Sequence, residues 1–269
     1  MNPLSKYKKS FILGMQSIME YRADFIMNLV SAAWPMIIQL FMWSSIYGGS
    51  GKEVMFGYTY AQMITYTVIA NIVQRLLRTY FEYEINDDIK NGGLDKFIVR
   101  PINYFQFRMF MFMGGKLVES VFIYGVLIGA ILILNASFGG IATLTSVVWF
   151  TAVLVLAALL NYVIFFCVGM FAFWLSEIGF FFEAVRIVFI ACSGGIFPLE
   201  VLGSGVVKVM NWLPFKYTVN FPVDVLCGRI PGSEVLGGLL VMGIWAMLLW
   251  LLSRVLWRSG LKRYIAAGG

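Results

Sequence analysis

Residues 147–174 read VVWFTAVLVLAALLNYVIFFCVGMFAFW and contain no charged side chain. A helix needs about 20 predominantly apolar residues to cross the hydrocarbon core of a bilayer. This stretch exceeds that length, so it predicts a membrane-crossing helix that is long enough to tilt. The stretch therefore places the chain among integral membrane proteins.

The composition of the whole chain agrees with this interpretation. Of the 269 residues, 60% are hydrophobic and 13% are charged, whereas a soluble domain carries about 25% charged residues. A water-soluble core of this size cannot hide so much apolar surface, so the lipid bilayer is the expected solvent. The basic residues flank apolar segments and form no patch with base-stacking aromatics, which argues against nucleic-acid binding.

Five further segments are expected to cross or enter the membrane. They are residues 25–47, 60–81, 113–134, 184–197 and 234–253. Together with the first stretch they predict an all-α integral membrane protein with six transmembrane helices, in one domain over residues 1–269. Pro35 is expected to kink the first helix, which a membrane helix tolerates. Lys116 and Glu119, near the start of the third helix, are expected to pair on one helix face.

The fifth segment, residues 184–197, is too short to cross the bilayer alone. The sequence over residues 194–233 is apolar but interrupted by Gly and Pro. Broken apolar backbone is stable at membrane depth only where protein buries it or where it lines a cavity. Residues 194–233 are therefore expected to form a re-entrant helical hairpin at the outer face.

The distribution of Lys and Arg predicts the orientation. Only Lys52, Lys208, Lys216 and Arg229 fall in segments expected outside, and the other sixteen of the 20 basic residues fall in segments expected inside. Cytoplasmic loops carry an excess of Lys and Arg. This asymmetry predicts that both termini lie in the cytoplasm.

Two polar segments are expected on the cytoplasmic side. In residues 1–24, an apolar stripe that includes Tyr7 and Phe11 predicts an amphipathic helix lying in the membrane interface. Residues 82–106 predict two short helices joined by a Gly–Gly pair, with charges of both signs. Such a segment suits the docking of a cytoplasmic partner, and the alternative is a solvated connector.

Several classes of chemistry lack the residues that they need. The chain has no histidine, and its three cysteines show no motif spacing, so neither a metal site nor a redox motif is expected. The run GGSGKE at residues 48–53 differs from a phosphate-binding loop, because Ile46 and Glu53 replace its first Gly and its Ser or Thr. No serine has a histidine partner. The chain is therefore not expected to be an enzyme.

Four motifs resemble a known family. They are IKNGGLD at residues 89–95 with Arg100 and Pro101, SGGIFPLE at 193–200, NWLPFKY at 211–217 with Pro222, and LWRSGLKRY at 256–264. In this order they resemble the permease subunits of type-2 ABC (ATP-binding cassette) exporters. The resemblance is closest to the ABC-2 or daunorubicin-type permease branch, and it covers most of the chain.

The resemblance implies a function and partners. It implies the transmembrane subunit of an ATP-driven exporter, which forms the translocation pathway as a permease homodimer or heterodimer. Two copies of a separate ABC ATPase subunit would bind ATP and Mg²⁺, so no cofactor is expected in this chain. The bilayer would be the cytoplasmic membrane of a prokaryotic cell.

The resemblance also assigns residues by position. Residues 84–94 correspond to the coupling helix, and residues 6–20 correspond to a connector helix near the ATPase. The residues expected at the ATPase-coupling interface are Glu84, Asp87, Asp88, Lys90, Asn91, Leu94 and Asp95. Those expected in the re-entrant or gate region are Phe197, Pro198, Pro214, Phe215 and Pro222.

The motifs do not identify a substrate. The aromatic residues Trp34, Phe41, Trp43 and Phe189 suit an apolar or amphipathic cargo, and they equally suit contact with lipid. The alternative function is an ATP-independent secondary transporter or channel, although no expected span carries the acidic, His or Lys series of a proton relay. A scaffold protein without transport is a further alternative.

Overall fold

The computed structural model describes residues 3–20, 22–99, 102–139 and 142–264. Arg100 and Pro101 of the first family motif lie outside these ranges. The α-helices are α1 (Pro3–Glu20), α2 (Arg22–Ser31), α3 (Ala33–Ser50), α4 (Tyr60–Leu77), α5 (Phe81–Lys90), α6 (Asp95–Ile98), α7 (Tyr104–Phe138), α8 (Leu144–Met170), α9 (Gly179–Cys192), α10 (Ser204–Met210), α11 (Asn220–Leu226) and α12 (Gly232–Leu261). The shorter elements are the strands β1 (Val54–Met55) and β2 (Tyr58–Thr59) and the 3₁₀ helices η1 (Phe171–Phe173) and η2 (Leu199–Leu202).

Four helical segments in the described ranges are long and apolar enough to cross a membrane. They are Ile26–Ser50, Tyr104–Phe138, Leu144–Phe173 and Gly232–Leu261. The protein is therefore an all-α membrane protein with several spans. α4 carries Asn71, Gln74 and Arg75 in its 18 residues, and α9 has only 14 residues. Six crossings consequently stay a prediction.

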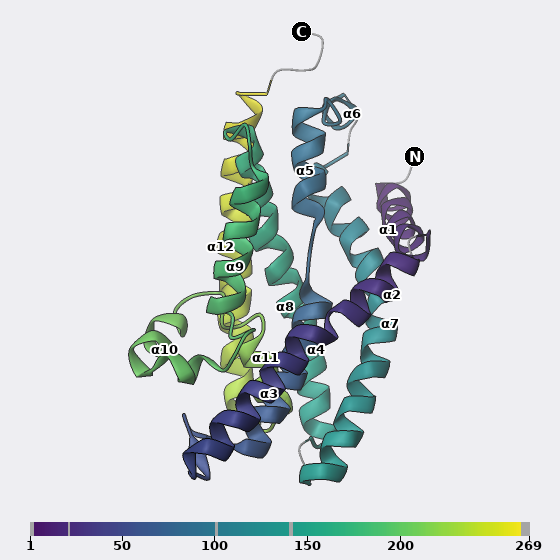
Figure 1. The fold of residues 1–269 in the computed structure, drawn as a ribbon. Helices are drawn as coiled ribbons and strands as arrows, with labels where there is room; N and C mark the ends of the chain where they lie inside the picture. The colour runs from purple at the N-terminus through teal and green to yellow at the C-terminus, as the bar shows by residue number, and fades with distance from the viewer. Residues whose placement is uncertain (1–2, 21, 100–101, 140–141, 265–269) are drawn as a thin grey trace.

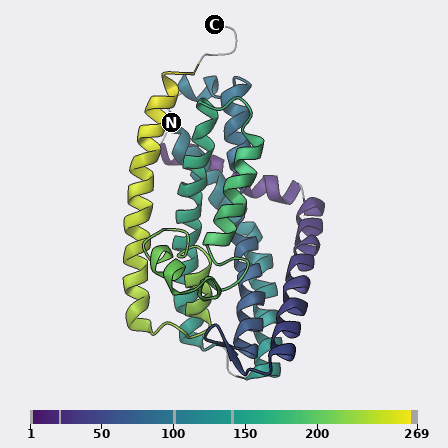
Figure 2. The same cartoon turned by 60° about the vertical axis from the view of Figure 1, so that its left-hand side comes forward.

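The long helices run side by side as a bundle (Figures 1 and 2). α5, α6 and the C-terminal end of α12 lie at one end of the bundle, and the β-hairpin lies at the other. α1 lies across the bundle near the α5 end, the arrangement expected of an interfacial helix. The strands pair antiparallel, and the positive φ angles of Phe56 and Gly57 form the tight turn between them.

α8 is the central helix of the bundle. Of its most apolar window, 72% is buried, against 17% or less in the other three spans. α5, α11 and α12 all pack against it, and Tyr162 near its middle donates a hydrogen bond of 2.8 Å to the carbonyl of Phe105 in α7. The outer faces of the other spans remain exposed apolar surface, as expected of helices that face lipid or another subunit.

The first span is interrupted at Ala32, between α2 and α3. Pro35 has no N–H to donate to the carbonyl of Ser31, and its ring crowds that carbonyl. The interruption lies about one turn ahead of Pro35, and the kink expected there stays a prediction.

The region after α9 differs from the expected hairpin. α9 begins at Gly179 rather than at residue 184. Downstream, α10 projects from the bundle (Figure 1), while every residue of α11 is buried, against α8 and α4. Residues 194–233 therefore form one outlying and one buried short helix rather than a paired hairpin. The depth of either helix in the membrane stays a prediction.

α1 and α7 cross in close contact at three glycines. A Cβ added at Gly14 would collide with the carbonyl of Met111, and one added at Gly114 would collide with the carbonyl of Phe11. Gly115 lies at the same crossing, where Ile18 is its neighbour. Small residues let two helix backbones approach closely, so these glycines hold the amphipathic α1 against α7.

We expect Gly114→Val to separate α1 from α7, because the added side chain has no space at the crossing. Overpacking of this kind costs about 1–3 kcal/mol. Gly125→Val is the matched control, since nothing lies within 4 Å of a Cβ at that position of the same helix. The melting temperature of the purified protein in mild detergent should fall for the first variant only. Equal melting temperatures would contradict the close crossing.

Candidate functional site

The helix expected over residues 60–81 ends early, and a break separates α4 from α5. α4 stops at Leu77, Arg78 is extended (φ −57°, ψ 134°), and α5 begins at Phe81. Carbonyl groups at such a break have no helical partner. At membrane depth they must be satisfied by neighbouring protein groups.

Three helices supply donors to three consecutive carbonyls at this break. Asn161 of α8 donates from Nδ2 to the carbonyl of Leu77. Lys116 of α7 donates from Nζ to the carbonyl of Arg78 at 2.7 Å. Arg186 of α9 donates from Nη1 to the carbonyl of Thr79, also at 2.7 Å. The break is therefore stabilised by specific side chains, which come from α7, α8 and α9.

Arg186 also links α9 to the first turn of α5. Its guanidinium forms an ion pair with Glu82, and the two side chains are 6% and 1% exposed. The Arg186 Cζ lies 4.6 Å from the ring centroid of Tyr80 and 5.5 Å from that of Phe165, at cation–π distances. A carboxylate in the first turn of a helix also interacts favourably with the helix dipole.

Lys116 forms the second ion pair at the break. Its Nζ lies 2.6 Å from Glu119, and the two side chains are 14% and 15% exposed. The pairing expected from their spacing is confirmed. Lys116 has a second role that the spacing did not predict, because its Nζ also donates to the carbonyl of Arg78 at the break.

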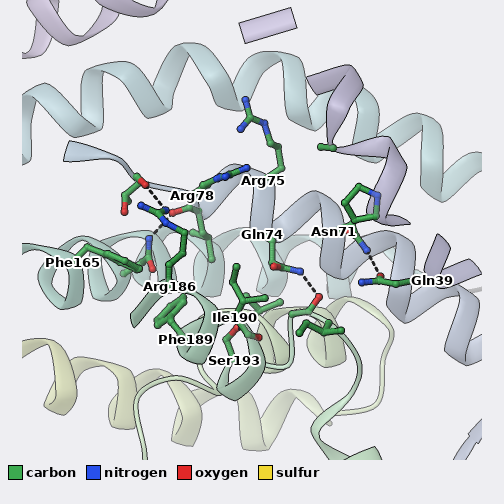
Figure 3. A pocket seen from close by; sticks show the side chains of 18 residues that line it. Gln39, Asn71, Gln74, Arg75, Arg78, Phe165, Arg186, Phe189, Ile190 and Ser193 are labelled. Atoms are coloured by element: carbon green, nitrogen blue, oxygen red, sulfur yellow. Dashed lines mark hydrogen bonds between the residues drawn. The ribbon is translucent and has the colours of Figure 1, made fainter. Parts of the chain in front are cut away.

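A cavity of about 290 Å³ adjoins the break (Figure 3). Its wall combines residues from α3, α4, α8 and α9 with residues near α11. The charged and amide side chains that line it are Gln39, Asn71, Gln74, Arg75, Arg78, Asn161 and Arg186. Its apolar side chains are Ala32, Pro35, Leu77, Phe165, Phe189, Ile190, Ile196 and Val219. Figure 3 shows the three arginines toward one side of the cavity and Gln39 with Asn71 toward the other.

Two amides tie the cavity wall together. Asn71 of α4 donates to Gln39 of α3 at 2.8 Å. Gln74 of α4 donates to the carbonyl of Gly195, just after α9. A Cβ at Gly195 would collide with the Gln74 side chain, so the glycine allows this close approach. These bonds hold α3 and the end of α9 against α4.

The neighbouring glycine of the same motif makes a second contact with α4. Tyr66 donates to the carbonyl of Gly194 at 2.7 Å, and Asn220 of α11 donates to the Tyr66 hydroxyl at 3.0 Å. Gly194 has φ +79°, a left-handed conformation that favours glycine. The SGG of the second family motif thus marks the place where α9, α11 and α4 meet.

A cluster of charged residues binds the face of α5 that lies opposite to Glu82. Arg108 of α7 forms ion pairs with Glu84 and Asp88. Tyr104 donates to Asp88 at 2.8 Å and accepts from Nε of Arg108 at 3.1 Å. Lys96 lies 3.5 Å from Asp88. α5 is therefore bonded to α7 by this cluster and to α9 by Arg186.

The residues expected at the ATPase-coupling interface divide into two groups. Asp87, Lys90 and Asn91 are exposed, and Glu84 is about half exposed. Asp88 and Leu94 are buried, so their side chains are not on the surface, and their place at the coupling interface stays a prediction. Asp88 faces inward because it follows Ile85 by three positions on the buried face of an amphipathic helix.

Asp95 belongs to neither group. Its carboxylate accepts a hydrogen bond of 2.6 Å from Tyr264, which follows α12. Burial and this bond raise the pKa of Tyr264 to about 12, so the hydroxyl keeps its proton at neutral pH and can donate. The contact ties α6 to the C-terminal end of α12.

The residues expected in the gate region lie around α9 and α11. Pro198, Pro214 and Pro222 are buried, while Phe197 and Phe215 are partly buried. The ring of Phe215 packs edge-on against Phe189 at 5.9 Å, next to the cavity. Their role as a gate stays a prediction.

Of the four aromatics considered for cargo contact, Phe189 lines the cavity, Trp43 is buried, and Trp34 and Phe41 face outward.

Sequence reasoning missed the residues that build the break. The sequence places Glu82 in the polar segment 82–106, Arg186 in the apolar segment 184–197 and Asn161 in the uncharged stretch 147–174, with no sign that the three meet. One indication was available, since Asn161 is a lone amide in an uncharged membrane helix. Polar residues inside membrane segments mark functional positions.

The sequence matches a known protein family over most of its length. Residues 33–268 match the family described as ABC-2 family transporter protein. The match covers most of the chain and includes the break, the cavity and α5. A comparison with curated proteins finds no match.

We expect Glu82→Gln to destabilise the protein strongly, because it leaves the buried Arg186 charge with only the half-exposed Glu183, 3.8 Å from its Nε. Removing one partner of a buried pair costs about 3–5 kcal/mol. Glu84→Gln is the matched control on the same helix. Glu84 is 53% exposed, so its loss should cost about 0–1 kcal/mol. Thermal unfolding followed by size-exclusion chromatography measures both, and similar losses would refute the importance of the buried pair.

Proposed function

Because this chain belongs to the ABC-2 family of transporter proteins and supplies the membrane-spanning permease component, we propose that it forms the pathway of an ATP-driven exporter. The permease acts as a dimer, with itself or with a second permease. The family implies an ABC ATPase partner, and we propose two copies of it, which bind ATP and Mg²⁺ and carry out hydrolysis. This chain contributes no catalytic residue.

The observation that carries this proposal is the bond between α5 and the cavity wall. Arg186 lines the cavity and pairs with Glu82 of α5 in a buried ion pair. Separating the two groups would leave the buried Glu82 carboxylate unpaired and Arg186 with only Glu183, 3.8 Å from its Nε, which is costly. A force applied to α5 is therefore transmitted to α9 and to the cavity.

The surface of α5 supports docking of the ATPase. Asp87, Lys90 and Asn91 are exposed at the bundle end that also contains α6 and the C-terminal end of α12 (Figure 1). Their charges suit a polar interface, where complementary charges fix register and partner choice. We propose that this end faces the cytoplasm of a prokaryotic cell and that both termini lie there.

The break between α4 and α5 provides the hinge. Residues 78–80 are non-helical between two helices, and hinges are short segments that absorb changes in φ and ψ. When ATP closes the partner subunits, they push on α5, which moves about the hinge together with Arg186. Coupling between sites amounts to about 1–3 kcal/mol, which does not exceed the about 3–5 kcal/mol lost when a buried ion pair is broken, so the pair can transmit it without separating.

We expect Asp87→Lys to weaken association with the ATPase subunit about tenfold, which corresponds to about 1.4 kcal/mol, without changing the melting temperature. Glu234→Lys is the matched control, because Glu234 is also an exposed acid but lies in the first turn of α12, at the other end of the bundle. Co-purification of the ATPase from native membranes measures association. A normal complex with Asp87→Lys, or recovery of the chain alone as a stable channel, would count against the proposal.

The orientation can be tested with single cysteines. We expect Gly49→Cys to react with a membrane-impermeant thiol reagent added outside intact cells, and Asn91→Cys to react only after the membrane is opened. Both positions are exposed. Cys192 and Cys227, which are partly exposed, are first replaced by alanine. The opposite labelling pattern would reverse the proposed topology.

A further inference from the structure

The cavity beside the break has an uneven charge distribution. The charged groups in its wall are the guanidiniums of Arg75, Arg78 and Arg186, and the described wall contains no carboxylate. Arg75 lies near both Glu119 and Arg78.

The carboxylates near the cavity are already bonded to other groups. Glu82 pairs with Arg186, and Glu119 pairs with Lys116 and also attracts Arg75. Arg78 forms no ion pair with any residue in the described ranges; its guanidinium stacks on Tyr80, with Cζ 4.8 Å from the ring centroid. The arginine side of the cavity therefore offers positive charge to a ligand.

The remaining wall is apolar. Apolar atoms make up the larger part of its surface, and Pro35, Phe189 and Ile190 supply side chains there. The volume of about 290 Å³ is near the lower limit of about 300 Å³ for small-molecule pockets. It suits a head group and the first part of a chain rather than a large rigid molecule.

We infer that this cavity binds the anionic head of an amphiphile, a carboxylate, sulfonate or phosphate group attached to an aliphatic chain. Arg78 holds the head by charge-assisted hydrogen bonds, with Arg75 and Arg186 beside it in the wall, and the apolar wall contacts the chain. This inference rests on the proposed function, because it assigns the substrate class of the exporter. Binding beside Arg186 also places the substrate next to the residue that connects the cavity to α5.

The test is equilibrium binding of radiolabelled dodecanoate, below its micelle concentration, to the purified protein with its co-purifying partners in phosphatidylcholine nanodiscs. Dodecanol and dodecyltrimethylammonium have the same chain with a neutral and a cationic head. We expect dodecanoate to bind most tightly, and the other two compounds to compete poorly with it. Equal binding of the three compounds would overturn the inference.

Variants locate the site. Arg78→Gln should weaken dodecanoate binding by about tenfold, since a hydrogen bond to a charged group contributes about 1.5–3 kcal/mol, while Arg78→Lys should retain most of it. The backbone carbonyl that accepts from Lys116 is unchanged in both. Arg254→Gln is the matched control, because Arg254 also lies over an aromatic ring, 4.7 Å from that of Trp250, but lines a different cavity. Equal effects of Arg78→Gln and Arg254→Gln would overturn the inference.

Two further readings separate the outcomes. If the natural ligand is a membrane lipid, phosphatidylglycerol added to the nanodiscs competes with dodecanoate. If the natural ligand is a free amphiphile, phosphatidylglycerol does not compete. Either result supports an anion site, provided that Arg78→Gln has lost dodecanoate binding. ATPase co-purification in the same preparation reports the proposed function independently. Failure of dodecanoate binding in a complex that retains its ATPase refutes the anion site alone.

Discussion

Hydrogen bonding to three consecutive backbone carbonyls is the interaction on which the rest of the structure depends. A helix that stops inside a membrane protein exposes carbonyls that neither water nor lipid can satisfy. Here the carbonyls of residues 77–79 receive donors from α8, α7 and α9 in turn. Because each donor comes from a different helix, the break fixes the relative positions of all three.

The same break joins two functional regions. On one side lies the arginine-lined cavity, whose wall includes the SGG segment held by Gln74 and Tyr66. On the other side lies α5, which is amphipathic and bonded to α7 and α9 by buried charges. Arg186 contacts both regions, so the cavity and the exposed face of α5 are separated by one ion pair rather than by a long chain of contacts.

The coupling segment shows the limit of reasoning from charge alone. Asp87 and Asp88 are adjacent in sequence, yet one is exposed and the other is buried against Arg108. Successive residues of an α-helix point about 100° apart, since 3.6 residues make one turn. The sequence indicated a short helix ended by glycine, and this is confirmed by α5 and by Gly92 at φ +73°. Which of its charges face inward depended on the position of Arg108 in α7.

The sequence by itself determined the features that follow from local patterns. Long uncharged runs specified membrane helices, Pro35 specified an interruption of the first span, and the spacing of Lys116 and Glu119 specified their ion pair, because each depends on neighbours within about one turn. Tertiary structure alone decided the break, the cavity and the bond from Arg186 to Glu82, whose partners are 104 residues apart. Contacts over such separations depend on how helices pack, and hydropathy along the chain does not record which faces meet.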